Sequence, residues 1–157
     1  MLEQSPEDLK KIAIRIPSWF EKRDATLQGI LYYIRKNQVE WQLDIPRSSD
    51  GELPEIIIDE NWQGDGIISF RFTEKEVETF NANDTKIVNV SSVTLPGLAT
   101  VKADNTQAGK VAARHFFELG LKKVVYIGRN NREYSVDRWL GLEQECQEQG
   151  IEAQKAE

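Results

Sequence analysis

The sequence predicts an α/β fold in which a Rossmann-like parallel sheet is flanked by helices on both faces. Two observations carry this prediction. Short apolar segments typical of strands alternate with longer amphipathic segments typical of helices, and turn or capping residues stand between them. Strict alternation of this kind favours parallel strands joined by right-handed crossovers. We therefore expect the element order β-α-β-α-β-α-β-(β)-α-β-α.

Five elements are expected in the first half of the chain. Residues 10–17 (KKIAIRIP) alternate in polarity and end at a proline, which is typical of a strand, whereas residues 20–36 place their large aliphatic side chains on one helical face. Residues 40–46 (EWQLDIP) predict a second strand. Residues 53–62 favour a helix, although three consecutive isoleucines leave a strand open. Residues 64–72 (GDGIISFRF) predict a tight turn followed by a buried strand.

The alternation continues in the second half. Thr73 and Glu76 have the spacing of a capping box, which predicts a helix that begins after residue 73. Residues 86–92 (KIVNVSS) predict a strand, and residues 100–103 (TVKA) predict a shorter one. A second long helix is expected from Asp104 to Leu119.

The last expected elements follow Gly120, which stands where a helix ends in the left-handed conformation. Residues 122–128 (KKVVYIG) predict a buried strand, and residues 130–134 predict a polar loop. Residues 135–149 then predict a helix that ends at Gly150.

The composition excludes several classes of protein. The chain has 157 residues, enough for one domain or slightly more, with a net charge of −6, one Cys and one His. A single Cys cannot form an internal disulfide, no apolar run approaches the roughly 20 residues of a membrane span, and the polar N-terminus does not resemble a signal peptide. We therefore expect a soluble cytoplasmic protein. The excess of acidic residues disfavours direct DNA binding by this chain.

The usual enzyme motifs are missing from the sequence. The turn after the first strand is PSWFEK, without the G-x-G-x-x-G of dinucleotide-binding folds, and neither a P-loop nor a G-x-S-x-G elbow is found. With one His and one Cys in the chain, His-based triads and zinc sites are disfavoured. Cys146 is interpreted as an inert helical residue, and His115 as a packed, hydrogen-bonded histidine. We expect no enzyme activity, no cofactor and no metal.

The stretch VKADNTQAGKVAARHFFELGLKKVVYIG, followed by SVDRWLGL, is similar to the core signature of sugar-responsive transcriptional regulators of the lactose-repressor and galactose-repressor (LacI/GalR) type. Their pattern is a strand, an Asp-Asn pair, a helix rich in small residues, a strand ending in Gly, and then Arg-x-x-Gly. The matching positions are Asp104, Asn105, Ala108, Gly109, His115, Leu119, Gly120, Ile127, Gly128, Arg138 and Gly141. Upstream, GDGIISF and TKIVNVSS resemble two further strands of the family, so the resemblance covers nearly the whole chain.

The resemblance implies a periplasmic-binding-protein-like domain of type I, in which a sugar lies between two lobes. Residues 1–103 correspond to the N-terminal lobe, and residues 104–157 to the beginning of a second lobe that we expect to be truncated. Within the family the chain looks closest to xylose operon regulators, where an AraC-type helix-turn-helix domain follows the sensing domain. These parallels predict weak or absent sugar affinity in a chain whose second lobe is incomplete.

The function that the resemblance implies is sugar sensing without catalysis. The effector is expected to be a small sugar, such as xylose or a related pentose, that favours one lobe arrangement and so repositions a DNA-binding domain absent from this chain. A homodimer is expected, as in the family, and no membrane partner. The alternative is a doubly wound α/β enzyme that uses cleft carboxylates such as Asp65 or Asp104 for acid–base chemistry.

Three candidate ligand residues follow the first strand, where the family contacts its effector. Trp19 and Phe20 have aromatic faces that stack on the C–H faces of sugars, but either ring can equally staple the next helix to the sheet. Arg23 lies in the first turn of that helix, where the helix dipole disfavours a cation. It is therefore either a ligand residue or simply an exposed arginine.

Two more candidates lie near the predicted boundary between the lobes. Ser91 matches the position after the fourth strand, which in the family is often an Asp that hydrogen-bonds the effector. Asp104 has capping-box spacing with Gln107, so helix capping explains it without a ligand, and both roles can coexist.

The last two candidates lie around the final predicted helix. Asn131 belongs to the polar loop that precedes it. Arg138 matches the family's effector-binding arginine in Arg-x-x-Gly, and the planar fork of its guanidinium suits paired sugar hydroxyls. A surface salt bridge with the neighbouring Asp137 is the alternative role for Arg138.

Overall fold

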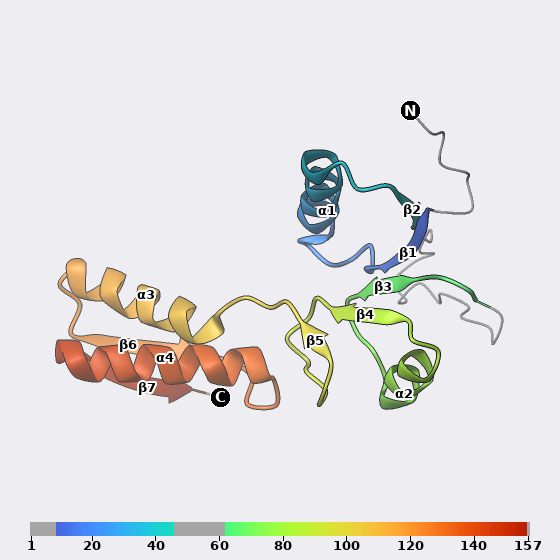
Figure 1. Cartoon of the computed structure of the whole chain (residues 1–157). Helices are drawn as coiled ribbons and strands as arrows, with labels where there is room; N and C mark the ends of the chain where they lie inside the picture. Colours follow the sequence, from blue (N-terminus) through green and yellow to red (C-terminus); the bar gives the residue numbers. More distant parts are fainter. Residues whose placement is uncertain (1–8, 46–61, 157) are drawn as a thin grey trace. The chain divides into compact units, whose positions relative to one another are not determined.

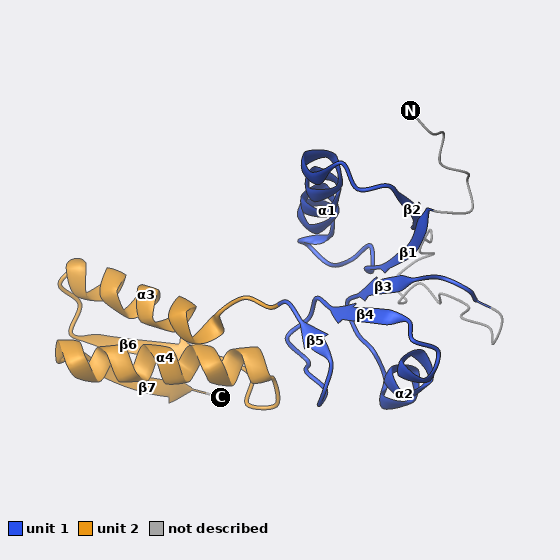
Figure 2. Ribbon diagram, in the orientation of Figure 1, with its two compact units in different colours: residues 1–101 blue, residues 102–157 orange. Residues whose placement is uncertain are grey.

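The computed structural model describes residues 9–45 and 62–156 (Figure 1). The chain divides into two compact units, residues 1–101 and residues 102–157 (Figure 2). The predicted helix over residues 53–62 falls almost entirely outside the described residues. No described helix is both long enough and apolar enough to cross a membrane.

The first unit contains a five-stranded sheet in the order β2-β1-β3-β4-β5. Its strands are β1 (Lys10–Arg15), β2 (Trp41–Asp44), β3 (Gly66–Ser69), β4 (Lys86–Asn89) and β5 (Ala99–Thr100). All four pairings are parallel, which confirms the predicted fold class. The strands at 86–92 and 100–103 are shorter than predicted, because sheet pairing stops at Asn89 in β4 and at Thr100 in β5.

Two helices connect the strands of the first unit. Helix α1 (Arg23–Asn37) leads from β1 to β2, and α2 (Glu74–Ala82) leads from β3 to β4, in the opposite direction across the sheet. Right-handed crossovers in opposite directions place the two helices on opposite faces, as Figure 1 shows. The predicted capping box at the start of α2 is confirmed. The buried core consists of Ala13, Ile67, Phe72, Val77, Phe80, Ile87 and Leu98.

The second unit is a smaller α/β arrangement. Its elements are α3 (Asn105–Glu118), β6 (Lys123–Ile127), α4 (Glu133–Gln149) and β7 (Glu152–Ala156). Strands β6 and β7 pair in parallel, with α4 as the crossover between them. Strand β7 is not among the predicted elements, because its sequence EAQKA has no apolar pattern and becomes a strand only by pairing with β6. Gly120 and Gly150 both have positive φ angles, as predicted for helix ends.

Helices α3 and α4 approach each other through two glycines. A Cβ atom added at Gly141 would lie 2.0 Å from the carbonyl oxygen of Thr106, and one added at Gly109 would lie 2.1 Å from that of Arg138. Both obstacles are backbone atoms of the facing helix, so a larger residue cannot be accommodated by a side-chain movement. The small residues therefore set how closely the two helices pack.

The structure places Cys146 as predicted, but not His115. Cys146 is fully buried in the core of the second unit, where burial raises the pKa of its thiol, in agreement with an inert role. The prediction of a packed His115 is wrong, because this residue is exposed on α3. The contacts of α3 in the second core are made instead by Ala113, with Ala112 and Phe116 packed beside it.

Candidate functional site

The strand order of the first unit indicates where a parallel sheet of this kind would bind a ligand. The chain leaves the carboxyl ends of the neighbouring strands β1 and β3 in opposite directions. Open α/β sheets bind their ligands outside the carboxyl ends of the strands at such a switch point. The residues that follow β1 and β3 are therefore the first candidates for a site.

Three aromatic rings gather at this switch point. The rings of Trp19 and Phe70 meet edge to face at 5.4 Å, and those of Phe20 and Phe70 lie 4.6 Å apart at a tilt. The guanidinium of Arg71 lies 5.6 Å from the centre of the Phe70 ring. Trp19 remains 51 % exposed. The structure thus brings the predicted residues Trp19 and Phe20 together with Phe70, which we had placed in a buried strand, and leaves the indole accessible.

Arg15, at the end of β1, is a buried arginine that sequence reasoning missed. Its Nε donates to the hydroxyl of Ser69 (2.9 Å), one Nη donates to the carboxylate of Glu76, and the other donates to the carbonyl of Arg71 (2.7 Å). Burial alone would raise the pKa of Glu76, but the hydrogen bonds from Arg15 and from the Thr73 backbone lower it overall. All three nitrogen atoms of Arg15 are therefore used inside the fold.

Two predicted site residues of the first unit also have partners within it. Arg23 donates from Nε to the carbonyl of Ile16 (3.3 Å), which ties the start of α1 to the end of β1. Ser91 is buried, and its hydroxyl donates to the side chain of Asn89 (3.1 Å) and accepts from the backbone of Val93 (3.2 Å). These contacts account for both residues structurally, and their role as ligand residues stays a prediction.

Arg138 lies in the first turns of α4. Unlike Arg15, it uses only one of its side-chain nitrogen atoms for a hydrogen bond within the described residues. Its Nε donates to the side-chain oxygen of Asn105 (2.9 Å), and its guanidinium lies 5.2 Å from the centre of the Tyr134 ring. Among the described residues, neither Nη group has a hydrogen-bond partner, and no ion pair joins Arg138 to Asp137. Arg138 as a residue is exposed.

The loop before α4 is held by a small hydrogen-bond network. The hydroxyl of Tyr126 donates to the carbonyl of Ser135 (2.9 Å), and the hydroxyl of Ser135 accepts from the backbone of Arg129 (2.8 Å). This network joins the end of β6 to the start of α4 and so fixes the path of the loop. Asn131 lies on this loop with its side chain exposed.

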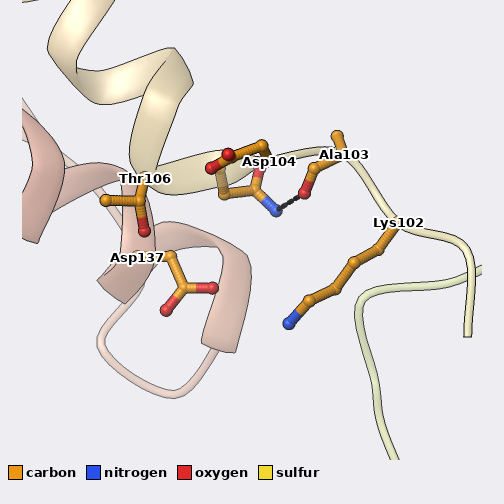
Figure 3. Close-up of a pocket in the computed structure, with 6 residues that line it drawn as sticks. Lys102, Ala103, Asp104, Thr106 and Asp137 are labelled. Atoms are coloured by element: carbon orange, nitrogen blue, oxygen red, sulfur yellow. Dashed lines mark hydrogen bonds between the residues drawn. The ribbon is translucent and has the colours of Figure 1, made fainter.

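A pocket of about 350 Å³ lies at the start of α3. It is lined by Lys102, Ala103, Asp104, Asn105, Thr106 and Asp137. Figure 3 shows the side chains of Lys102 and Asp137 pointing toward one another. The amine of Lys102 donates to Glu133 (2.7 Å), and this hydrogen bond raises the pKa of Lys102. The pocket therefore presents charged groups of both signs next to the residues that hold Arg138.

Asp104 caps helix α3, as predicted. Its carboxylate accepts a hydrogen bond from the backbone of Gln107 (2.8 Å), which satisfies one of the free amide groups at the helix start. Asp104 is at the same time a lining residue of the pocket (Figure 3). Capping therefore leaves Asp104 in the lining of a pocket, and its role as a ligand residue stays a prediction.

Of the two carboxylates named for the enzyme alternative, Asp104 caps α3 and Asp65 belongs to the first unit. Asp65 precedes β3, at the amino end of the sheet, and accepts from the amine of Lys10 (2.6 Å) and the backbone of Lys11 (2.8 Å). These hydrogen bonds lower the pKa of Asp65, which is the opposite of what a general acid requires. Among the described residues, no group of three or more His, Cys, Asp and Glu side chains is placed to hold a metal ion.

The structure resembles solved structures of sugar-binding proteins and of transcriptional regulators. A periplasmic solute-binding protein of an ABC transporter from Actinobacillus succinogenes, with bound D-allose, matches with a TM-score of 0.67 and 17 % identity over 94 % of this chain and 59 % of that one. A ribose operon repressor protein from Lactobacillus acidophilus matches with a TM-score of 0.67 and 21 % identity over 94 % of this chain and 56 % of that one. A periplasmic binding protein/LacI transcriptional regulator from Alkaliphilus metalliredigens, complexed with D-xylulofuranose, matches with a TM-score of 0.64 and 18 % identity over 94 % of this chain and 56 % of that one.

These likenesses establish the fold, an α/β architecture with parallel sheets flanked by helices, like that of periplasmic-binding-protein-like domains. At this level of identity they do not by themselves carry over a function. No family model and no curated protein matches the sequence. The chain spans between 56 and 60 % of the length of the structures it matches.

Proposed function

We propose that this chain is part of the sugar-sensing effector-binding domain of a bacterial transcriptional regulator of the LacI/GalR type. Its function is to bind a small sugar without chemical conversion, so that the bound sugar favours one conformation of the regulator. The signature residues around Asp104, Arg138 and Gly141 support this proposal, as does the likeness to sugar-binding regulators and binding proteins.

The observation that carries the proposal is the state of Arg138. Its guanidinium is oriented by Asn105 and Tyr134 and exposed, and its two Nη groups have no partner among the described residues. A planar pair of donors fits two neighbouring hydroxyl oxygens of a sugar. An arginine that served only the fold would use these donors internally, as Arg15 does.

The aromatic rings at the end of β1 and β3 support the same proposal from the first unit. Trp19 keeps half of its surface accessible although it packs on Phe70. Sugar-binding sites combine apolar ring surfaces with a few placed polar groups. Trp19 would therefore cover a C–H face of the sugar, with Phe20 as its support.

The finer parts of the proposal rest on the sequence resemblance. The effector is a pentose such as xylose, residues 1–103 and 104–157 belong to two lobes, and the regulator is a cytoplasmic homodimer that binds DNA through a helix-turn-helix domain outside this chain. The proposed set of ligand residues consists of Trp19, Phe20, Arg23 and Ser91 in the first unit and Asp104, Asn131 and Arg138 in the second.

Isothermal titration with D-xylose, D-ribose, L-arabinose, D-allose and D-glucose tests the proposal. The measurement uses this chain and the product of the complete reading frame that contains it. Replacing Arg138 with alanine is expected to weaken the binding of the active sugar by about tenfold to a hundredfold, since hydrogen bonds to a charged group contribute roughly 1.5–3 kcal/mol. The matched control R35A removes an exposed arginine from the last turn of α1 and is expected to leave affinity unchanged. Absence of heat with every sugar in the complete protein would contradict the proposal.

A further inference from the structure

The geometry points to Asn105 as a positioning residue that holds the guanidinium of Arg138 by its Nε, so that both Nη groups are kept for a pair of neighbouring oxygen atoms on the ligand. This inference rests on the proposed function and deepens it, because it assigns the specificity of the site to a residue that does not itself contact the sugar. The two residues are 33 positions apart in the sequence.

The orientation of the Asn105 side chain is determined by its two partners. Asn105 is only 4 % exposed, and its amide nitrogen donates to the carbonyl of Ala103 (3.2 Å). Its amide oxygen accepts from Nε of Arg138 (2.9 Å). A flipped amide would place its nitrogen against Nε and its oxygen against the Ala103 carbonyl, and both hydrogen bonds would be lost. A buried amide with both ends in use therefore stays in one orientation.

The backbone of Arg138 is fixed independently of its side chain. The tight contact of α3 with α4 brings Gly109 against the Arg138 carbonyl, so helix packing sets the position of the Arg138 backbone. The long arginine side chain would still sample many rotamers from this position. Asn105 and the Tyr134 ring are the two groups in the described chain that restrict it, the first by a hydrogen bond and the second by a cation–π contact.

Engagement through Nε leaves a defined set of donors. The two Nη groups of an arginine present parallel N–H bonds that match two adjacent oxygen atoms. Because Asn105 orders the side chain before the ligand arrives, less conformational entropy is lost on binding. Arg15 is the contrasting case in the same chain, because its Nε and both of its Nη atoms each donate a hydrogen bond within the fold.

Hydrogen exchange of arginine Nε–H groups, measured by NMR on the wild-type chain, tests the positioning without any ligand. The Arg138 signal is identified by its loss in R138K, and that of the exposed Arg35 by its loss in R35K. We expect the Arg138 Nε–H to exchange at least several-fold more slowly than that of Arg35, since it is hydrogen-bonded to a buried oxygen. Equal exchange rates for the two groups would overturn the inference.

Two variants at position 105 test how the hydrogen bond from Arg138 to Asn105 affects exchange and sugar affinity. N105A removes the acceptor, and we expect fast exchange at Arg138 Nε–H and a roughly three- to tenfold loss of affinity for the sugar that binds the wild type, the cost of ordering one long side chain. N105D keeps an acceptor for Nε, and we expect it to retain slow exchange. Loss of protection in N105D together with unchanged protection in N105A would overturn the inference.

The two hypotheses can fail separately. If no sugar binds to the complete wild-type protein, the proposed function is contradicted, while the exchange rates still decide whether Asn105 holds Arg138. If a sugar binds and N105A changes neither exchange nor affinity, the inference is overturned and the proposed function stands. If N105A does not fold, the wild-type comparison with Arg35 and the N105D variant carry the test.

Discussion

In the first unit, the arginine at the end of β1 is buried and all three of its side-chain nitrogen atoms bind groups of the fold, whereas in the second unit Arg138 is exposed and binds the fold only through Nε. Both arginines lie near the carboxyl ends of parallel strands, and both face an aromatic ring. The difference lies in how many donors remain available. Arg15 stabilises the unit that contains it, while Arg138 keeps a planar pair of donors that a ligand can use.

The largest difference in the free energy of unfolding is expected between the two variants in which one arginine, Arg15 or Arg138, is replaced by alanine. R15A should lower the free energy of unfolding by about 3 kcal/mol, because it leaves the half-buried Glu76 without its cation and empties a buried site beside Ser69. R138A should cost less than about 1 kcal/mol, because the side chain is exposed and makes a single hydrogen bond. Urea unfolding followed by circular dichroism measures both, and equal losses would remove the contrast between the two arginines.

A second pair of substitutions compares the helices of the two units. G141A should destabilise the protein by roughly 1–3 kcal/mol, because its Cβ would meet the backbone of Thr106 and force α3 and α4 apart. G29A in α1 is the matched control: beyond its chain neighbours and the backbone of its own helix, no atom of the described residues lies within 4 Å of the added Cβ, and alanine should raise stability by about 0.5–1 kcal/mol. Thermal unfolding of both variants checks the signs. A stabilising G141A would show that the two helices are free to separate.

The pH dependence of stability sharpens the comparison further, because the second unit has an acid–arginine pair of its own. The carboxylate of Glu145 accepts two hydrogen bonds from Arg114 (both 2.9 Å), and these lower the pKa of Glu145 against the effect of burial. A group with a lowered pKa adds stability above its unfolded pKa, about 4.3 for Glu, and loses this contribution as the pH falls. E145Q should therefore flatten the dependence of the free energy of unfolding on pH below about pH 4.3, and the slope should change by at most one proton.

The measurement is the urea midpoint of wild type and E145Q across pH 3–6. E118Q serves as the control, since Glu118 is an exposed residue at the end of α3. An E145Q profile parallel to that of the wild type would mean that the Arg114 pair does not contribute to folding stability.

The smallest effect is expected from matched changes in the two sheets. Ile67 is buried in β3, and I67V should cost about 0.5–1.5 kcal/mol. Ile127 in β6 is 81 % exposed, so I127V should change stability by less than about 0.5 kcal/mol. Chemical unfolding of the two variants tests whether β6 is as accessible in solution as in the structure. A similar loss at both positions would indicate that Ile127 is covered.

Much of the fold could be predicted because its signals are local. The 3.6-residue and two-residue periods, the Thr73–Glu76 capping box and the glycines at helix ends each depend on residues within one element. The boundaries were less accurate, since a strand ends where its partner ends. Strand β7 was missed for the same reason, because its partner β6, and not its own composition, makes it a strand.

For the candidate site, the sequence by itself determined which residue types lie in the loops and first helical turns at the strand ends, including Trp19, Asp104 and Arg138. Only the tertiary structure decided what each side chain contacts: that Ser91 is enclosed by its own turn, that Arg15 donates to Ser69, Glu76 and the Arg71 carbonyl, and that Asn105 holds Arg138. The physical reason is that hydrogen bonds between residues 30 or more positions apart depend on strand order and on the close packing of α3 with α4, and neither leaves a periodic trace in the sequence.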